Sequence, residues 1–414
     1  MRKEFLSFLA KQKAPKYIRP VPKSFIQKIC PTFLKQMKHA YKKSQEWQAV
    51  NTEELIQVIN NITDIPGHDS VLRTPSYYFS SAMKEEVRKL SNFKIQIFFD
   101  LPLTKTNVRL SLVVPSLQYP IQKSIMKIYM WLMMVDIWCY HNKKPRERKT
   151  NKVFLFLYLM PKKKEGEVLT TEFVNSAYAH QNARIETQED HIVIFREEEW
   201  FKVFIHETFH LFNMDLGAMD TTNMMRQLAY IFGFPKHQTM LMNEMYSETC
   251  ATIINAAFVA FFNMEDELAK GKDTSKSKIK TKDFCSFWTE LLYMEQLFSL
   301  WQGCKMIQKL GIEQMLLLDS NKGLPLLSQQ THVFEYYILK MLLMSNLPEF
   351  LNMCTIMNSM DSLLYFKKKA KYQNALLNVV KTSPMLKHPK YFLNWMTTTC
   401  PPFLQRSLRM TLLG

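Results

Sequence analysis

The sequence predicts an α+β fold, in which a small mixed or antiparallel sheet packs on one central helix and a mostly helical C-terminal domain follows. Three observations predict it. Residues 93–114 alternate apolar and polar side chains, residues 153–159 form an apolar run of strand length, and the chain beyond residue 284 carries apolar residues at helical spacing. At 414 residues the chain is long enough for two or three domains, each with a buried core.

The first predicted region is a basic N-terminal arm, residues 1–60. The chain carries a formal net charge of +17, and twelve Lys and Arg residues fall within residues 1–50 against only Glu4 and Glu46. Such an arm suits an acidic partner, namely a nucleic acid, an acidic membrane face or an acidic protein assembly. A basic surface that only meets solvent has the same composition, so the partner stays open.

A domain over residues 61–265 is predicted to hold the sheet. Its expected elements are a hairpin of residues 93–99 and 108–114, a buried helix over 125–140, a strand over 153–159, and extended stretches over 173–178 and 191–195. The helix over 125–140 is the best membrane candidate, but it is short and contains Lys127 and Asp136. We therefore expect it in the core and predict no transmembrane segment.

Two further helices are expected in the same domain. Residues 197–214 begin with three glutamates, which suit the positive end of a helix dipole, and continue with apolar residues at helical spacing. Gly217 marks the expected end of this helix, and another helix is expected over 238–262. A Lys-rich linker, residues 266–283, then leads to the helical domain over 284–414.

Composition narrows the classes of function. Only nine glycines occur, which leaves no room for long Gly-rich phosphate loops and disfavours nucleotide-binding enzymes. Seven cysteines, an odd number with no CxxC pair, fit free thiols, and the first twenty residues lack the apolar run of a secretory signal. These features predict a cytoplasmic protein with reduced cysteines.

The segment Phe204-Ile-His-Glu-Thr-Phe-His210 carries the main chemical signal. His206 and His210 are four residues apart, so on a helix both imidazoles project from one face and can bind one Zn²⁺ ion. Glu207 adjoins the same face and is suited to act as general base toward a water activated at the metal. The apolar neighbours predict burial, where imidazoles need partners, and ordinary hydrogen bonds are the competing explanation.

A catalytic zinc site needs a third protein ligand, and Glu244 and Glu248 are the candidates because they lie four apart on one helical face. The stretch from Asn243 to Glu248, Asn-Glu-Met-Tyr-Ser-Glu, resembles the Asn-Glu-x-x-Ser-Asp pattern of thermolysin-like gluzincins. The resemblance implies that Glu244 is the third ligand and that Glu248 supports a zinc-bound histidine from behind. Spacing alone leaves the reverse assignment open.

Other metal-site patterns fit less well. The metzincin pattern needs Gly and His three and six residues past the second His, and those positions hold Asn213 and Leu216. Asp215 is a distant alternative ligand, but five residues beyond His210 it points partly off the metal face of the helix. The gluzincin pattern is therefore the expected one.

The blocks 174–178, 191–196 and 198–210 resemble the gluzincin-like metallopeptidases of large nucleocytoplasmic DNA viruses, and the similarity is clear over residues 174–260. It implies that Asn175 to His180 form an edge strand that holds the substrate backbone in extended form. It also implies a Tyr or His that stabilises the oxyanion opposite Glu207. The best sources are His332, Tyr336 and Tyr337, although aromatic residues at helical spacing are more often core residues.

The leading hypothesis is a zinc-dependent metallopeptidase that hydrolyses a peptide or protein substrate. Its alternative is a virion structural or assembly protein built on the same fold, with or without activity, that resides in the host cytoplasm and is incorporated into the virion. In that case the basic arm would bind an acidic viral assembly component or nucleic acid. A protein that only binds nucleic acid is a third hypothesis, which rests on charge alone.

Overall fold

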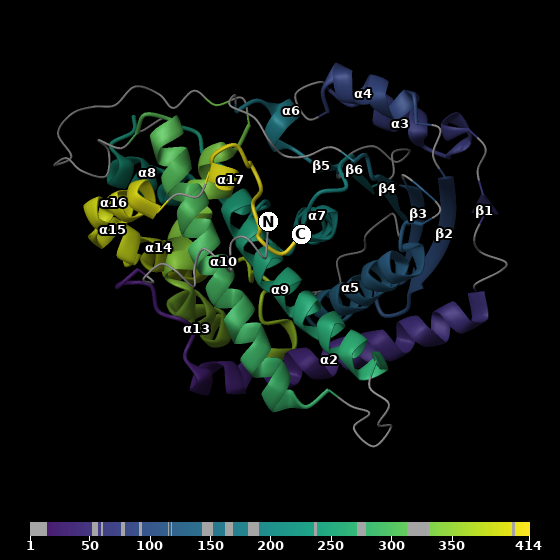
Figure 1. Cartoon of the computed structure of the whole chain (residues 1–414), viewed down its shortest axis with the longest axis horizontal. Coiled ribbons are helices and arrows are strands. Elements are labelled where there is room, and N and C mark those ends of the chain that lie inside the picture. The colour runs from purple at the N-terminus through teal and green to yellow at the C-terminus, as the bar shows by residue number, and fades with distance from the viewer. Residues whose placement is uncertain are drawn as a thin grey trace.

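The computed structural model describes residues 15–51, 57–58, 61–75, 79–90, 93–114, 116, 118–142, 152–161, 169–180, 190–235, 238–270, 279–312, 329, 331–399 and 402–414. The expected α+β fold class is confirmed, because a mixed sheet lies beside many helices (Figure 1). Residues 1–14 of the expected basic arm and residues 271–278 of the expected linker lie outside the described residues.

The sheet has six strands in the order β1-β2-β3-β4-β6-β5. They are β1 (Gln57–Val58), β2 (Phe93–Leu101), β3 (Thr106–Val114), β4 (Lys152–Tyr158), β5 (Ala177–His180) and β6 (Asp190–Ile194). β2 and β3 form the expected antiparallel hairpin, β3, β4 and β6 run parallel, and β5 pairs antiparallel with β6 at one end of the sheet. The sheet is therefore mixed, and β5 is an edge strand.

Both faces of the sheet are covered. On β4, Leu155 and Leu157 face the main core, whereas Phe154 and Phe156 face a smaller core beneath α3 (His68–Arg73) and α4 (Ser81–Arg88). Figure 1 shows α5 (Ile121–Asn142) and α7 (Trp200–Leu211) on the opposite side of the sheet from α3 and α4. A strand buried on both faces needs apolar residues at every position, which explains the continuous apolar run of β4.

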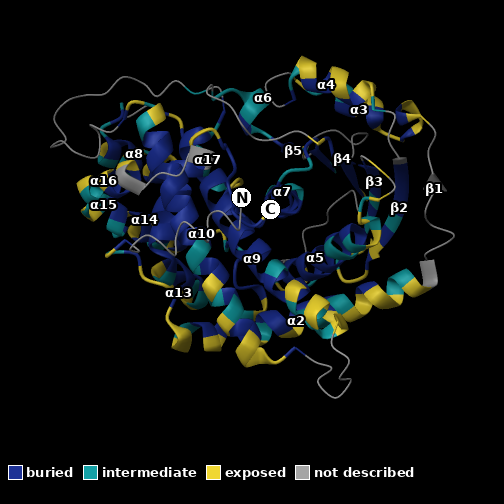
Figure 2. Ribbon diagram, in the orientation of Figure 1, coloured by how far each residue is buried: buried dark blue, intermediate teal, exposed yellow. Residues whose placement is uncertain are grey.

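The remaining elements are helical. They are α2 (Lys23–Asn51), η1 (Ile62–Asp64), α6 (Thr171–Val174), α8 (Thr222–Phe232), α9 (Met242–Lys270), α10 (Thr281–Lys309), the π-helix η3 (Phe334–Leu339), α12 (Lys340–Ser345), α13 (Leu347–Met357), η4 (Met360–Ser362), α14 (Ala370–Lys381), α15 (Pro384–Lys387), α16 (Pro389–Thr399) and α17 (Pro402–Gln405). Figure 2 shows that α9 and α10 are buried along much of their length. α9 is long and apolar enough to cross a bilayer, but 94% of its most apolar window is buried inside the protein.

Three sequence expectations need correction. The stretch 173–178 is not extended throughout, because α6 ends at Val174 and only the residues from Ala177 onward join the sheet. The His-bearing helix ends at Leu211, well before Gly217. The N-terminal region is not a free arm from residue 18 onward, because Ile18 and Val21 are buried and α2 packs Ile26, Phe33 and other apolar residues into the main core. Each difference depends on packing between distant segments, which local patterns do not report.

Two of the expected domain limits, at residues 265 and 284, fall inside helices. α9 runs past residue 265 to Lys270, and α10 begins at Thr281, inside the expected linker. One apolar core includes Ile205 of α7, Ile254 of α9 and Leu342 of α12, so the sheet region and the later helices share buried contacts. Helices from both parts of the chain can therefore contribute to one site.

A disulfide corrects the expectation of free thiols throughout. Cys30 of α2 bonds to Cys285 of α10 across 255 residues of sequence. Cys139, Cys250, Cys304 and Cys354 are buried thiols outside any disulfide among the described residues. The pairing joins two helices that are distant in the chain, so cysteine spacing could not predict it.

Candidate metal centre

Helix α7 carries both histidines of the expected site. It follows β6 directly and packs against β5 and β6 on one side and against α9 on the other. His206 and His210 lie one turn apart, and their ring centres are 4.7 Å from each other. His206 is buried and His210 is nearly so, because apolar neighbours such as Phe204 and Phe209 anchor the helix in the core.

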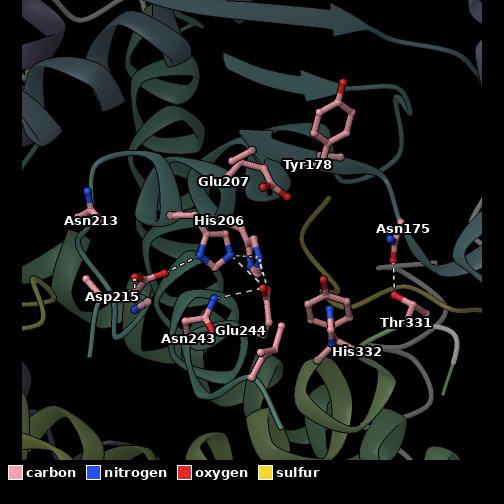
Figure 3. A pocket seen from close by; sticks show the side chains of 17 residues that line it. Asn175, Tyr178, His206, Glu207, Asn213, Asp215, Asn243, Glu244, Thr331 and His332 are labelled. Carbon is pink, nitrogen blue, oxygen red and sulfur yellow. Dashed lines mark hydrogen bonds and ion pairs between the residues drawn. The ribbon is translucent and has the colours of Figure 1, made fainter. Parts of the chain in front are cut away.

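Glu244, in the first turn of α9, faces both histidines. Its Oε2 atom lies 3.1 Å from His206 Nε2 and 3.2 Å from His210 Nε2, and the two Nε2 atoms are 2.9 Å apart. Figure 3 shows His206 and Glu244 meeting at one side of a cavity. Within the described residues, these three side chains are the one group of His, Cys, Asp or Glu positioned to share a metal ion.

Carboxylates lie behind both imidazoles. Asp215 Oδ2 lies 2.5 Å from His210 Nδ1, and Glu248 Oε2 lies 3.1 Å from His206 Nδ1. The second pair is an ion-pair contact. A carboxylate at Nδ1 favours the tautomer with its proton on Nδ1, which leaves the Nε2 lone pair free to bind a metal.

The spacing of the two Nε2 atoms and the Glu244 Oε2 atom is close to that of the ligands of a zinc ion. Zinc bonds to imidazole nitrogen and carboxylate oxygen are about 2.0–2.2 Å long, so two ligand atoms in a tetrahedral site lie roughly 3.3–3.5 Å apart. The observed separations of 2.9, 3.1 and 3.2 Å are a few tenths of an ångström shorter. A small outward movement of the side chains would admit the ion, and the donor set of two imidazoles and one carboxylate suits zinc.

The protonation of each histidine and carboxylate in the cluster depends on the charge of its neighbours. Burial alone would lower the pKa of His210, but Glu244 and Asp215 outweigh it and hold the pKa well above its usual value. Burial alone would raise the pKa of Glu244, but His210 and His206 outweigh it and hold the pKa well below its usual value. Without a metal, the cluster therefore retains protons on imidazole beside an ionised carboxylate, and zinc must displace those protons.

Glu248 is surrounded by positive charge as well as by His206. Lys202 of α7 forms an ion pair with its Oε1 atom, and Lys340 at the start of α12 lies 3.1 Å from the same oxygen. All of these side chains are buried. Burial alone would raise the pKa of Glu248, but Lys202 and Lys340 outweigh it and keep the carboxylate ionised. Its Oε2 atom is left to face the imidazole.

Glu207 points into the cavity beside the histidines (Figure 3). Burial raises its pKa, against the lowering effect of His206 and His210. A carboxylate whose pKa is raised toward neutrality suits proton transfer near physiological pH. Glu207 therefore stays the candidate general base.

The cavity has a volume of about 630 Å³, within the usual range for ligand sites. One wall is the edge strand β5, which contributes Ala177, Tyr178 and Ala179. The opposite wall is formed by residues before and within the π-helix η3. Thr331 Oγ1 donates to Asn175 Oδ1 at 2.6 Å, so the two walls touch at one end (Figure 3).

Of the three candidates for the residue that stabilises the oxyanion, two line the cavity and one does not. His332 and Tyr336 both line the cavity, and the Tyr336 ring centre is 5.9 Å from that of His206. Tyr337 points elsewhere, since its hydroxyl donates to Leu408 O at 2.5 Å. A π-helix places successive side chains differently from an α-helix and is frequent at functional sites, which explains why spacing alone did not separate Tyr336 from Tyr337.

Sequence reasoning missed three residues of the site. Asp215 was weighed as a distant ligand, but it contacts Nδ1 of His210 rather than the shared metal position. Lys202 and Lys340 were not noticed, because a lysine in an apolar helix gives no sign of its partner. For Asp215 a signal was available in the sequence: Gly217 lies two residues beyond it, in the turn after α7, and an Asp in such a turn often binds a backbone N–H group two residues on.

Comparisons with protein-family models, with curated proteins and with solved structures found no match to this chain. The function must therefore be argued from the geometry of the site.

Proposed function

We propose that this protein is a zinc-dependent metallopeptidase of the gluzincin type. The observation that carries the proposal is the convergence of His206 Nε2, His210 Nε2 and Glu244 Oε2 on one point, with Glu207 beside them in a cavity. The sequence resemblance to gluzincins is independent support for Glu244 as the third ligand. The position of Glu248 at the rear of His206 fits the same assignment.

His206, His210 and Glu244 would hold the zinc ion. As a Lewis acid, zinc supplies polarisation of the peptide carbonyl and acidification of water. Glu207 accepts the proton of the attacking water and passes it to the leaving amine. The phenol of Tyr336, or the imidazole of His332, donates a hydrogen bond to the oxygen that gains negative charge.

β5 is suited to hold the substrate. Among the described strands it pairs only with β6, and its residues line the cavity. An extended peptide can pair with the open edge of such a strand, which would place its carbonyl groups beside Glu207. The substrate is therefore an extended segment of polypeptide.

The proposal is tested by metal analysis of purified protein and by hydrolysis of a peptide library. We expect one zinc per chain and an activity that a chelator removes and added zinc restores. Glu207→Gln should retain zinc and lose hydrolysis, whereas Glu197→Gln, in the turn before the same helix and outside the cavity, should keep both. Protein that binds no zinc would contradict the proposal. Zinc binding without hydrolysis would favour the alternative, a virion structural or assembly protein built on the same fold.

A further inference from the structure

The C-terminal segment, Ser407 to Leu413, runs through the interior of the protein. Every residue of it is buried, although it belongs to no helix and to none of the six strands. A buried segment outside the helices and strands must satisfy most of its backbone groups in another way. Figure 1 places the end of the chain beside α7, near the centre of the molecule.

Side chains of the surrounding helices bind this backbone. Glu199, just before α7, accepts from Met410 N and Thr411 N, and Glu295 of α10 accepts from Leu412 N and Leu413 N. Backbone oxygens are bound by Asn255, Gln302, Lys305, Tyr337 and Lys340. The segment is thus held like a peptide ligand by buried polar groups from several helices.

One of these contacts leads directly to the metal centre. Lys340 Nζ donates to Met410 O and also lies 3.1 Å from Glu248 Oε1. Glu248 Oε2 in turn lies 3.1 Å from His206 Nδ1. A continuous series of short polar contacts therefore runs from the C-terminal segment to a proposed zinc ligand.

The position of Glu248 depends on this series. The contact with His206 involves only Oε2, so the imidazole alone does not fix the whole carboxylate. Lys202 and Lys340 fix it instead, because both bind Oε1 and leave Oε2 turned toward His206. Met410 O is the second acceptor of Lys340 Nζ, and a buried ammonium that loses an acceptor is destabilised, so the docked segment helps to hold Lys340 beside Glu248.

We propose that Lys340 is a positioning residue for the metal centre, and that zinc binding and docking of the segment Ser407–Leu413 are coupled through it. The inference rests on the proposed zinc site. Coupling between two binding events is reciprocal, so a docked segment strengthens zinc binding and zinc holds the segment in place. The segment would thus act as an internal ligand that completes the support of His206.

The first test measures zinc affinity by competition with a chelator. Lys340→Met keeps the aliphatic stem and removes the ammonium, and we expect affinity to fall by about tenfold or more, the usual effect of losing support behind a metal ligand. Lys340→Arg should restore part of it. Lys305→Met is the comparison, because this buried lysine binds Ser407 O of the segment and Leu404 O just before it, whereas Lys202 and Lys340 are the lysines paired with Glu248. It should lower zinc affinity less than Lys340→Met does, since it weakens docking but leaves the link to Glu248 in place. Equal losses in the two variants would contradict the positioning role of Lys340, and an unchanged affinity in Lys340→Met would overturn the inference.

The second test measures amide hydrogen exchange with and without zinc. Its main result comes from the unmodified protein. In the unmodified protein, zinc should slow exchange at the amides of Met410 to Leu413, and in Lys340→Met this protection should shrink. Unchanged exchange on adding zinc to a protein that binds it would overturn the coupling. Failure of the unmodified protein to bind zinc would instead contradict the proposed function, so the two failures are distinguishable.

Discussion

The Nδ1 atom of His210 lies 2.5 Å from Oδ2 of Asp215, and this contact fixes one half of the candidate metal centre. Asp215 is buried and is itself held in place, because Ser247 Oγ donates to Oδ2 at 3.2 Å and Gly217 N donates to Oδ1 at 2.9 Å. A fully bonded carboxylate behind an imidazole sets both the tautomer and the ring orientation. Asp215 thereby directs His210 Nε2 toward Glu244.

Asp215→Asn should weaken zinc binding. Asparagine has nearly the same shape, but it carries no charge and can present an N–H group to Nδ1, which would favour the wrong tautomer of His210. We expect zinc affinity to fall by about 10- to 100-fold, as measured by chelator competition.

Asp220→Asn serves as the control, because Asp220 is an exposed acid five residues further along that binds Thr222 N. Its zinc affinity should be unchanged. A zinc affinity within about twofold of the unmodified protein for Asp215→Asn would show that the contact has no part in metal binding.

Tyr336→Phe should reduce hydrolysis without loss of zinc. Its phenol lines the cavity near His206, and removal of one donor to an oxyanion lowers kcat by about 10²- to 10³-fold. KM and zinc content should change little, since the donor acts in the transition state. The measurement is steady-state kinetics on a cleaved peptide together with metal analysis.

Tyr337→Phe is the matched control for this substitution. It removes a hydroxyl from the adjacent residue, but that hydroxyl binds Leu408 O outside the cavity. We expect lower thermal stability and nearly unchanged kcat. If the Tyr337 variant lost as much kcat as the Tyr336 variant, the oxyanion role of Tyr336 would be wrong, and His332 would be tested next.

His68 lies in α3, on the face of the sheet opposite α7, and we expect it to lower the stability of the protein at acidic pH. Burial lowers the pKa of His68, and its Nδ1 atom lies 2.8 Å from the hydroxyl of Tyr158. The unfolded chain takes up a proton as pH falls below about 6.5, whereas the folded protein resists it. Protonation therefore favours the unfolded state. Above about pH 6.5 the effect of His68 on the free energy of unfolding is absent, and below that pH the free energy of unfolding falls.

The check is the change in Tm between pH 7.5 and pH 5.5. His68→Asn retains a polar group near Tyr158 without a titrating ring, so its Tm should fall less than that of the unmodified protein over this interval. His388→Asn, at a half-buried site in the C-terminal part of the chain, is the comparison. Identical falls in all three proteins would exclude His68 as a source of the pH dependence.

The strand and helix predictions are confirmed where the apolar pattern of a single segment is long enough to identify the element. The hairpin of β2 and β3, the buried strand β4 and the helices α5, α7 and α9 were all expected, because alternation or helical spacing persists over many residues. The short elements α3, α4 and α8 were not expected. Elements of this size are stabilised mainly by tertiary packing, so their local pattern is weak.

The sequence by itself determined that His206, Glu207 and His210 share one helix, because helical periodicity places residues four apart on one face. It also offered Glu244 and Glu248 as partners, without deciding between them. The tertiary structure decided which carboxylate faces Nε2 and which faces Nδ1, since that depends on how α9 crosses α7.

Contacts between distant segments were also decided only by packing. Asp215 behind His210, the lysines around Glu248, and the C-terminal segment bound to Lys340 are contacts between residues that lie from 5 to 92 positions apart. Local spacing fixes neighbours within about one helical turn. Buried charges, in contrast, find partners wherever the folded core brings them, because an unpaired charge in the core is too costly to keep.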